Sequence, residues 1–188
     1  TSPEHAPPPA PGEAWSAGDA ETNARRWADS ARAWNDRALE RVNANRARLG
    51  LSPIDDVLSF NVTDRPWLAA DAALAPAPRG PVVQTGAWIL EDEAPLPAPV
   101  TDFLSSGAPP IYFGFGSMPA PKDAGRTLVA AARAIERRAI LARGWAALEA
   151  DDSLAIDDVN QQALFPRVAA VVHHGGAGTT AAAARAGV

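Results

Sequence analysis

The residues best suited to chemistry lie near the end of the chain, where an apolar run leads through glycines into an alanine-rich helix. This run is Val171-Val172-His173-His174-Gly175-Gly176-Ala177-Gly178-Thr179-Thr180. Glycines let the backbone approach a ligand closely, and the first-turn N–H groups of a helix, with the positive end of its dipole, bind anions. A diphosphate fits such a site. Because the run lacks the Gly-Lys-Ser/Thr ending of a P-loop, it does not indicate hydrolysis of a nucleoside triphosphate.

A second loop of the same kind is Gly114-Phe115-Gly116-Ser117, which also follows an apolar run. Around the two loops short strands and helices alternate, and this alternation predicts right-handed crossovers and a parallel sheet, so the fold class is α/β. Ligands of such sheets bind outside the carboxyl ends of the strands, so the loops after residues 115, 142, 156 and 172 should share one rim. We expect strands at 111–115, 138–142, 154–156 and 169–172, and helices at 122–136 and 161–165.

The first half of the chain carries a long helical pattern over residues 22–49. Thr22 is the expected N-cap, and Gly50 follows the last turn. Trp27 and Trp34 lie on one stripe of this helix, which we interpret as core packing rather than as a substrate platform.

Three further segments bear on organisation. Residues 1–18 hold too many prolines for a helix and are typical of an irregular surface loop. Residues 95–99 alternate proline with small residues after an acidic stretch, which predicts an interdomain linker. We interpret Arg137 and Arg138 as the solvated end of a helix.

The composition is that of a globular protein, with 188 residues of which 47% are apolar and 21% charged. A net charge of −5 argues against nucleic acid as a partner. No run approaches the roughly 20 apolar residues of a membrane span, so we expect no stable membrane insertion and a cytoplasmic location. The chain has no cysteine and therefore no thiolate metal site.

Four motifs occur in an order that resembles a known family. They are the Gly-Phe-Gly-Ser turn, Arg143-Gly144-Trp145, Val159-Asn160-Gln161-Gln162 and the His-His-Gly-Gly-Ala-Gly-Thr-Thr run. In this order they resemble the C-terminal domain of nucleotide-sugar-dependent glycosyltransferases of the GT-B fold. Residues 64–71 and 84–90 are similar to the transferases that glycosylate vancomycin-group glycopeptide antibiotics, and sterol and glycolipid glycosyltransferases share the last motif.

The resemblance implies two Rossmann-like domains, of which this chain holds parts. Residues 1–90 would be the end of the acceptor-binding N-domain, 91–108 a linker, and 109–188 a partial nucleotide-sugar-binding C-domain. The implied activity is inverting transfer of a hexose from a UDP- or TDP-sugar to a hydroxyl of a natural-product aglycone, by a monomer without metal or other cofactor. The chain begins without methionine and stops soon after a helix has begun, so we expect a fragment that is inactive alone and has an unpaired apolar sheet edge.

The resemblance also implies roles for single residues. His174 would contact the donor phosphate, and backbone N–H groups with two hydroxyls would hold the remaining phosphate oxygens. The diphosphate site would consist of Ser117, His174, Gly175, Gly176, Ala177, Gly178 and Thr179, and the nucleoside site of Trp145, Val159 and Gln162. The family's catalytic base lies near the start of the N-domain, so none is assigned here.

Simpler roles stay open for several of these residues. Ser117 could cap the next helix, Trp145 could be a core residue, and His174 could be a structural turn histidine. We discount His173 and His174 as a metal pair, because adjacent residues at a strand end point to opposite sides.

Three alternative functions remain. A sterol or glycolipid could be the acceptor. The run 176–181 satisfies Gly-x-Gly-x-x-Ala, which also occurs in NAD(P)-dependent oxidoreductases, although that fingerprint normally follows the first strand of its domain and here several strands come first. The chain could also be an inactive nucleotide-binding fragment.

Overall fold

The computed structural model describes residues 6–8, 14, 16 and 18–188, so the loop predicted at 1–18 lies largely outside the described residues. The chain divides into two compact units, Thr1–Gly86 and Ala87–Val188. Each unit has its own secondary structure and is described by itself.

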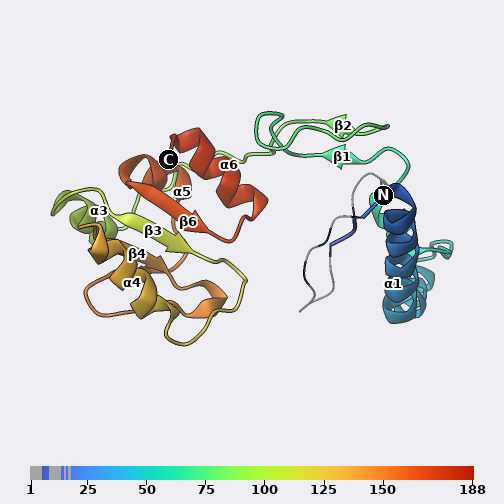
Figure 1. The fold of residues 1–188 in the computed structure, drawn as a ribbon, viewed down its shortest axis with the longest axis horizontal. Helices are drawn as coiled ribbons and strands as arrows, with labels where there is room; N and C mark the ends of the chain where they lie inside the picture. Colours follow the sequence, from blue (N-terminus) through green and yellow to red (C-terminus); the bar gives the residue numbers. More distant parts are fainter. Residues whose placement is uncertain (1–5, 9–13, 15, 17) are drawn as a thin grey trace. The chain divides into compact units, whose positions relative to one another are not determined.

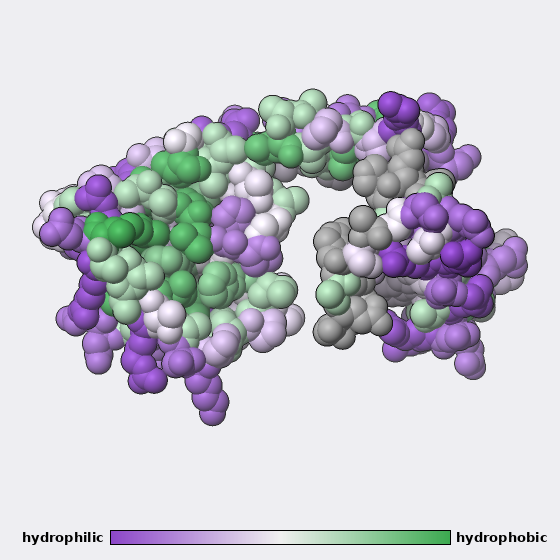
Figure 2. All heavy atoms as spheres, in the orientation of Figure 1, coloured by the Kyte–Doolittle hydropathy of each residue, from purple (hydrophilic) through white to green (hydrophobic). Residues whose placement is uncertain are grey.

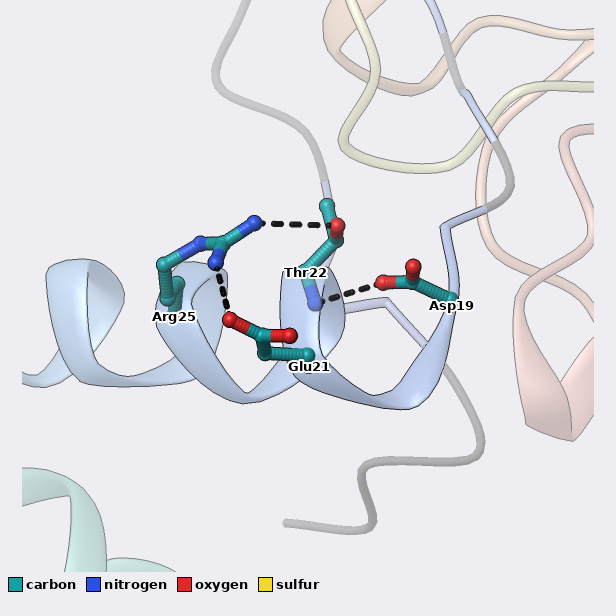
Figure 3. Close-up of polar contacts among 4 residues, drawn as sticks. All are labelled: Asp19, Glu21, Thr22 and Arg25. Atoms are coloured by element: carbon teal, nitrogen blue, oxygen red, sulfur yellow. Dashed lines mark hydrogen bonds and ion pairs between the residues drawn. The ribbon is translucent and has the colours of Figure 1, made fainter.

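The first unit is built on the long helix α1 (Ala20–Arg48), close to the helix predicted at 22–49. Thr22 is not its N-cap. Asp19 caps the helix instead, because its Oδ1 accepts a hydrogen bond of 2.8 Å from the Thr22 backbone N–H. Figure 3 shows this cap beside the ion pair of Arg25 with Glu21, at 2.7 Å.

The tryptophan stripe of α1 packs less completely than the sequence predicts. Trp34 is 43% exposed, with the guanidinium of Arg37 5.9 Å from its ring centroid, so the expectation of core packing is wrong for this residue. Trp27 is half-buried. The buried residue of α1 is Asn23, whose Nδ2 donates to the carbonyl of Gly18 at 3.0 Å. The buried residue of α1 is therefore polar and binds the segment just before the helix, which apolar periodicity does not reveal.

Polar side chains of α1 hold the loop that leads to α2 (Val57–Val62). Asn43 binds both backbone groups of Ile54, accepting from its N–H at 2.8 Å and donating to its carbonyl at 2.9 Å. The Oδ1 of Asn35 accepts from the N–H of Val57 at 2.9 Å. After α2, the short strands β1 (Trp67–Leu68) and β2 (Val83–Gln84) pair in parallel.

No helix in the described part of the chain is both long enough and apolar enough to cross a membrane. The longest helix, α1, presents a largely hydrophilic surface in Figure 2.

The second unit is a four-stranded parallel sheet in the order β5-β4-β3-β6, which confirms the predicted α/β class. Its strands and helices alternate along the chain as the sequence predicts (Figure 1). The strands are β3 (Ile111–Gly114), β4 (Ala139–Ala142), β5 (Leu154–Ile156) and β6 (Ala170–His173). The helices are α3 (Ala98–Ser105), α4 (Ala124–Ala134), α5 (Gln161–Leu164) and α6 (Ala177–Ala186), with 3-10 turns η1 (Gly144–Ala146) and η2 (Phe165–Arg167).

Both faces of this sheet are covered, because successive residues of a strand point to opposite sides. Ile111 and Phe113 of β3 pack with α4 in one buried cluster. Tyr112 packs with α3, α5, η2 and α6 in the other. Figure 1 shows α4 and α6 on opposite sides of the sheet. Helices therefore cover both faces of the sheet.

The segment interpreted as a linker, residues 91–108, contains α3, whose Val100 and Leu104 are buried in the second unit's core. The predicted domain limits stay predictions, while the compact units divide between Gly86 and Ala87. Arg138 was expected at a solvated helix end. This prediction is wrong, because the residue is half-buried.

Arg138 binds the last turn of α3 and the residues that follow it. Its guanidinium donates to the carbonyls of Phe103 and Ala108 and to the hydroxyl of Ser106, and lies 4.4 Å from the Phe103 ring centroid. Arg137 is exposed, as predicted. Long-range contacts with backbone carbonyls, which sequence spacing does not encode, explain the difference between these neighbours.

Candidate functional site

Three loops meet at the carboxyl edge of the second unit's sheet. Strand β3 lies between β4 and β6, with Gly114 opposite Ala142 on one side and His173 on the other. Because the three strands run in parallel, the loops that follow them start from the same edge. The predicted shared rim is confirmed for these neighbours.

Glycines allow two of these loops to touch. Gly116 and Gly144 have φ angles of +57° and +49°, a conformation that side chains rarely adopt. A Cβ placed on Gly144 would lie 2.5 Å from the carbonyl oxygen of Gly116. The N–H of Trp145 donates to that same oxygen at 2.9 Å. The loops after β3 and β4 are therefore fastened together.

The imidazole of His174 occupies the space beside two glycines. A Cβ on Gly116 would lie 3.1 Å from its Cε1, and a Cβ on Gly176 would lie 2.7 Å from its Nε2. The residue is exposed on the rim. His174 is thus positioned by the loops after β3 and β6 and remains open to a ligand.

His173 plays a different part. Its Nδ1 accepts a hydrogen bond of 3.1 Å from the N–H of Gly175, so it shapes the turn into α6. Within the described ranges, no group of three or more His, Cys, Asp or Glu side chains could hold a metal ion. The two histidines divide into one that supports the loop and one that faces outward.

The amino end of α6 has the features of an anion site. Gly176 is its N-cap and provides no side-chain hydrogen bond to the first turn. The hydroxyl of Thr180 donates to the carbonyl of Gly176 at 2.9 Å and is therefore engaged in the helix. The predicted ligands Ala177, Gly178 and Thr179 form the first turn, where N–H groups lack partners within the helix.

Ser117 lies exposed in the loop after β3. Helix α4 begins only at Ala124 and has Asp123 as its N-cap, so Ser117 does not cap it. The structural alternative for this residue is excluded, and Ser117 follows directly after Gly116, which contacts His174.

The predicted nucleoside residues have unequal surroundings. Trp145 is 82% exposed, which excludes the core role and leaves its ring accessible. Val159 is half-buried and packs against the core cluster of α3, α5 and α6. Gln162 is exposed, and its Nε2 donates to the carbonyl of Leu90 at 2.8 Å. Val159 and Gln162 follow β5, the next strand after β4 on the rim.

The sequence placed Asn160 in a motif but predicted no role for its buried side chain. Its Oδ1 accepts from the N–H of Ala163 at 3.0 Å and caps α5. Its Nδ2 donates to the carbonyls of Asp92 at 2.7 Å and Ala94 at 2.8 Å. An asparagine just before a short helix is a capping signal that could have been found. The two contacts with residues 92 and 94 have no such signal.

Tyr112 is a second residue that the sequence did not single out. Burial raises the pKa of its phenol, a hydrogen bond with the Gln161 side chain lowers it, and the charge of Asp158 raises it further, for a net increase. Its ring packs edge-on against Phe165 at 5.0 Å. A Cβ on Gly114 would lie 2.6 Å from the Tyr112 hydroxyl, so glycine at that position makes room for this phenol.

Several curated proteins that this chain is similar to are glycosyltransferases. No protein-family model matches the chain. Vancomycin aglycone glucosyltransferase of Amycolatopsis orientalis is 54% identical over 78% of this chain and 37% of its own length. Glycosyltransferase GtfE of the same organism is 48% identical over 99% of this chain and 47% of its own length. The dTDP-epi-vancosaminyltransferase of that organism is 48% identical over 78% and 39%.

The resemblance to vancomycin-group glycosyltransferases, predicted from the motifs, is confirmed by these identities. The chain spans less than half the length of these relatives. Among solved structures, the glycosyltransferase SnogD from Streptomyces nogalater matches 55% of this chain and 28% of its own, with 24% identity and a TM-score of 0.37.

Proposed function

We propose that the complete protein is an inverting glycosyltransferase of the GT-B fold, which moves a hexose from a UDP- or TDP-sugar to a hydroxyl of a glycopeptide-type aglycone. The observation that carries the proposal is the position of His174 beside Gly116 and Gly176, next to the amino end of α6, which no side chain caps. The names of the relatives, one a vancomycin aglycone glucosyltransferase and one a dTDP-epi-vancosaminyltransferase, support the substrate classes.

The proposed reaction is a direct displacement. The acceptor oxygen bonds to the anomeric carbon of the sugar, the bond from that carbon to the diphosphate oxygen breaks, and the nucleoside diphosphate leaves with the electron pair. The acceptor's proton passes to a base that we do not assign among these residues. Negative charge grows on the departing diphosphate, and the site's task is to stabilise that charge.

His174 and the first turn of α6 suit this task. An imidazole N–H and the N–H groups of residues 177–179 are hydrogen-bond donors held in place before the reaction, and the helix dipole favours an anion there. The hydroxyls of Thr179 and Ser117 complete the proposed phosphate ligands. No metal or other cofactor is part of the proposal.

The nucleoside would lie along the rim toward β5. The exposed ring of Trp145 offers a stacking surface for the base, and Val159 with Gln162 borders the ribose side. That the matched relatives are glycosyltransferases favours this function over an NAD(P)-dependent oxidoreductase. A monomeric state and a cytoplasmic location stay predictions.

The test uses the complete protein with UDP- and TDP-hexoses and a glycopeptide aglycone. We expect His174→Ala to lower turnover at least about tenfold, because positioned donors to a developing anion contribute about 2.7–4 kcal/mol in other enzymes. His174→Gln, which keeps an N–H donor, should retain more activity. Unchanged turnover in His174→Ala would overturn the phosphate role, and a wild-type protein that transfers neither sugar would overturn the function.

A further inference from the structure

A segment that precedes α3 is tied to the start of α5 by side chains. We call residues 88–94 the strap. Three of its carbonyl groups accept hydrogen bonds: Asp92 and Ala94 from Nδ2 of Asn160, and Leu90 from Nε2 of Gln162, all at 2.7–2.8 Å. The strap therefore lies against the loop after β5, which carries the proposed nucleoside residues.

The contacts with the strap require an asparagine at position 160, whereas capping of the helix does not. Its Oδ1 caps α5, a role that Asp or Ser fulfils equally well. Only an amide combines that acceptor with two N–H donors, and both donors of Asn160 bind strap carbonyls. Asn160 is 6% exposed, whereas Asp92 and Ala94 are exposed, so the two hydrogen bonds join a buried amide to a surface segment. Losing the donors would leave the Asp92 and Ala94 carbonyls without their protein partner and release the strap from the start of α5.

The loop 157–160 is consequently held from two sides. Val159 packs against the core, and Asn160 binds the strap. A ligand that lies along 159–162 meets a backbone whose conformation is already fixed, and binding then costs little ordering. Without the strap contacts, the same loop would have to be ordered when the ligand binds.

We propose that Asn160 is a positioning residue for the nucleoside part of the donor, which it fixes through the strap without touching the nucleotide itself. This inference rests on the proposed function, since it assigns the loop's ligand as the nucleoside of UDP or TDP. It adds residues 88–94, none of which was predicted as a site residue, to the structure on which nucleotide affinity depends.

The experiment compares two substitutions in the complete protein. Asn160→Ser and Asn160→Asp both keep an acceptor for the Ala163 N–H, and both remove the donors to Asp92 and Ala94. Asn43→Asp is the matched control, because Asn43 also clamps backbone groups, those of Ile54, in the other unit. Hydrogen exchange of the strap and calorimetric titration with UDP and TDP are measured for each protein, followed by steady-state kinetics.

We expect the strap to exchange faster in both Asn160 variants. Kd and the donor KM should rise about three- to tenfold, with kcat within about twofold of wild type. Asn43→Asp should leave all of these values unchanged. If the wild type binds nucleotide and Asn160→Ser binds it equally well, the positioning role is overturned. If exchange at the strap is unaffected, the strap mechanism is overturned. A wild type that binds neither UDP nor TDP overturns the proposed function, and this inference with it.

Discussion

The imidazole of His174 lies against Gly116, where an added Cβ would be 3.1 Å from its Cε1. The two residues come from different loops and meet because β3 and β6 are paired with Gly114 opposite His173. Gly116 therefore serves two purposes. Its φ of +57° allows the loop to turn, and its missing side chain leaves room for the imidazole.

We expect Gly116→Ala to displace the His174 imidazole and to weaken nucleotide binding. Gly50→Ala is the matched control, since Gly50 has a similar φ of +68° and nothing within 4 Å of an added Cβ. Both variants should lose about 1–2 kcal/mol of stability, because an L residue is strained in this conformation. Only Gly116→Ala should also raise the Kd for UDP or TDP, by about tenfold in calorimetry. Equal nucleotide affinity in the two variants would show that the contact with His174 has no role in binding.

Tyr112 gives a direct optical test of burial, because it is the chain's one tyrosine. Burial raises the pKa of its phenol, the hydrogen bond with Gln161 lowers it, and the charge of Asp158 raises it. The net pKa lies above the ordinary value of 10.0. In a pH titration, the absorbance of tyrosinate should therefore rise at a higher pH in the folded protein than in urea. A folded protein that titrates with or before the unfolded chain would contradict the packing of Tyr112 under Gly114.

The raised pKa of Tyr112 also predicts that the free energy of unfolding falls at high pH. The folded state holds the phenolic proton more tightly than the unfolded state, so the free energy of unfolding keeps this contribution below the unfolded pKa near 10. It loses the contribution as pH rises through the higher folded pKa. Tyr112→Phe should remove this part of the alkaline loss, which urea unfolding at several pH values would measure.

The rim could be predicted from the sequence because its determinants are local. Alternating strand and helix patterns predict parallel strands, whose following loops start from one edge of the sheet. Glycines after two of these strands predict which loops can approach a ligand. The structure confirms that arrangement around β3 and β6. The helix α1 is also encoded locally. Its predicted cap, Thr22, was wrong, because the hydrogen bond that caps the helix is accepted by Asp19.

Other features could not be predicted, since they join segments that are distant in sequence. Asn160 reaches the strap, and Arg138 reaches the carbonyls after α3, through donors whose targets carry no sequence signature. The core role predicted for Trp34 was wrong, because helical spacing indicates which residues share a face but not whether another element covers that face. The ligand roles of Ser117 and Trp145 remain predictions, with their structural alternatives now excluded.

The start of α1 provides a prediction for acidic pH (Figure 3). Hydrogen bonding with the Thr22 side chain, and then with its backbone N–H, lowers the pKa of Asp19 below 3.8. The stabilisation of the helix start is therefore present above the unfolded pKa and is lost as pH falls through the folded pKa. Asp19→Ala should reduce helicity in far-UV circular dichroism at neutral pH, whereas Asp19→Asn should keep a capping acceptor and lose the pH dependence. Identical acid profiles for wild type and Asp19→Asn would contradict the assignment.

The neighbours Arg137 and Arg138 offer the sharpest comparison for the second unit's stability. Arg138 donates to three groups at the end of α3 and just after it, and stacks on Phe103. The planar guanidinium allows this geometry and a lysine ammonium does not reproduce it. We expect Arg138→Lys to cost about 2 kcal/mol, since hydrogen bonds to charged groups contribute about 1.5–3 kcal/mol each and a lysine keeps only some of them. Arg137→Lys, at an exposed position, should change stability by less than about 0.5 kcal/mol. Urea unfolding followed by circular dichroism measures both, and equal midpoints would show that the anchoring of α3 to β4 does not depend on the guanidinium.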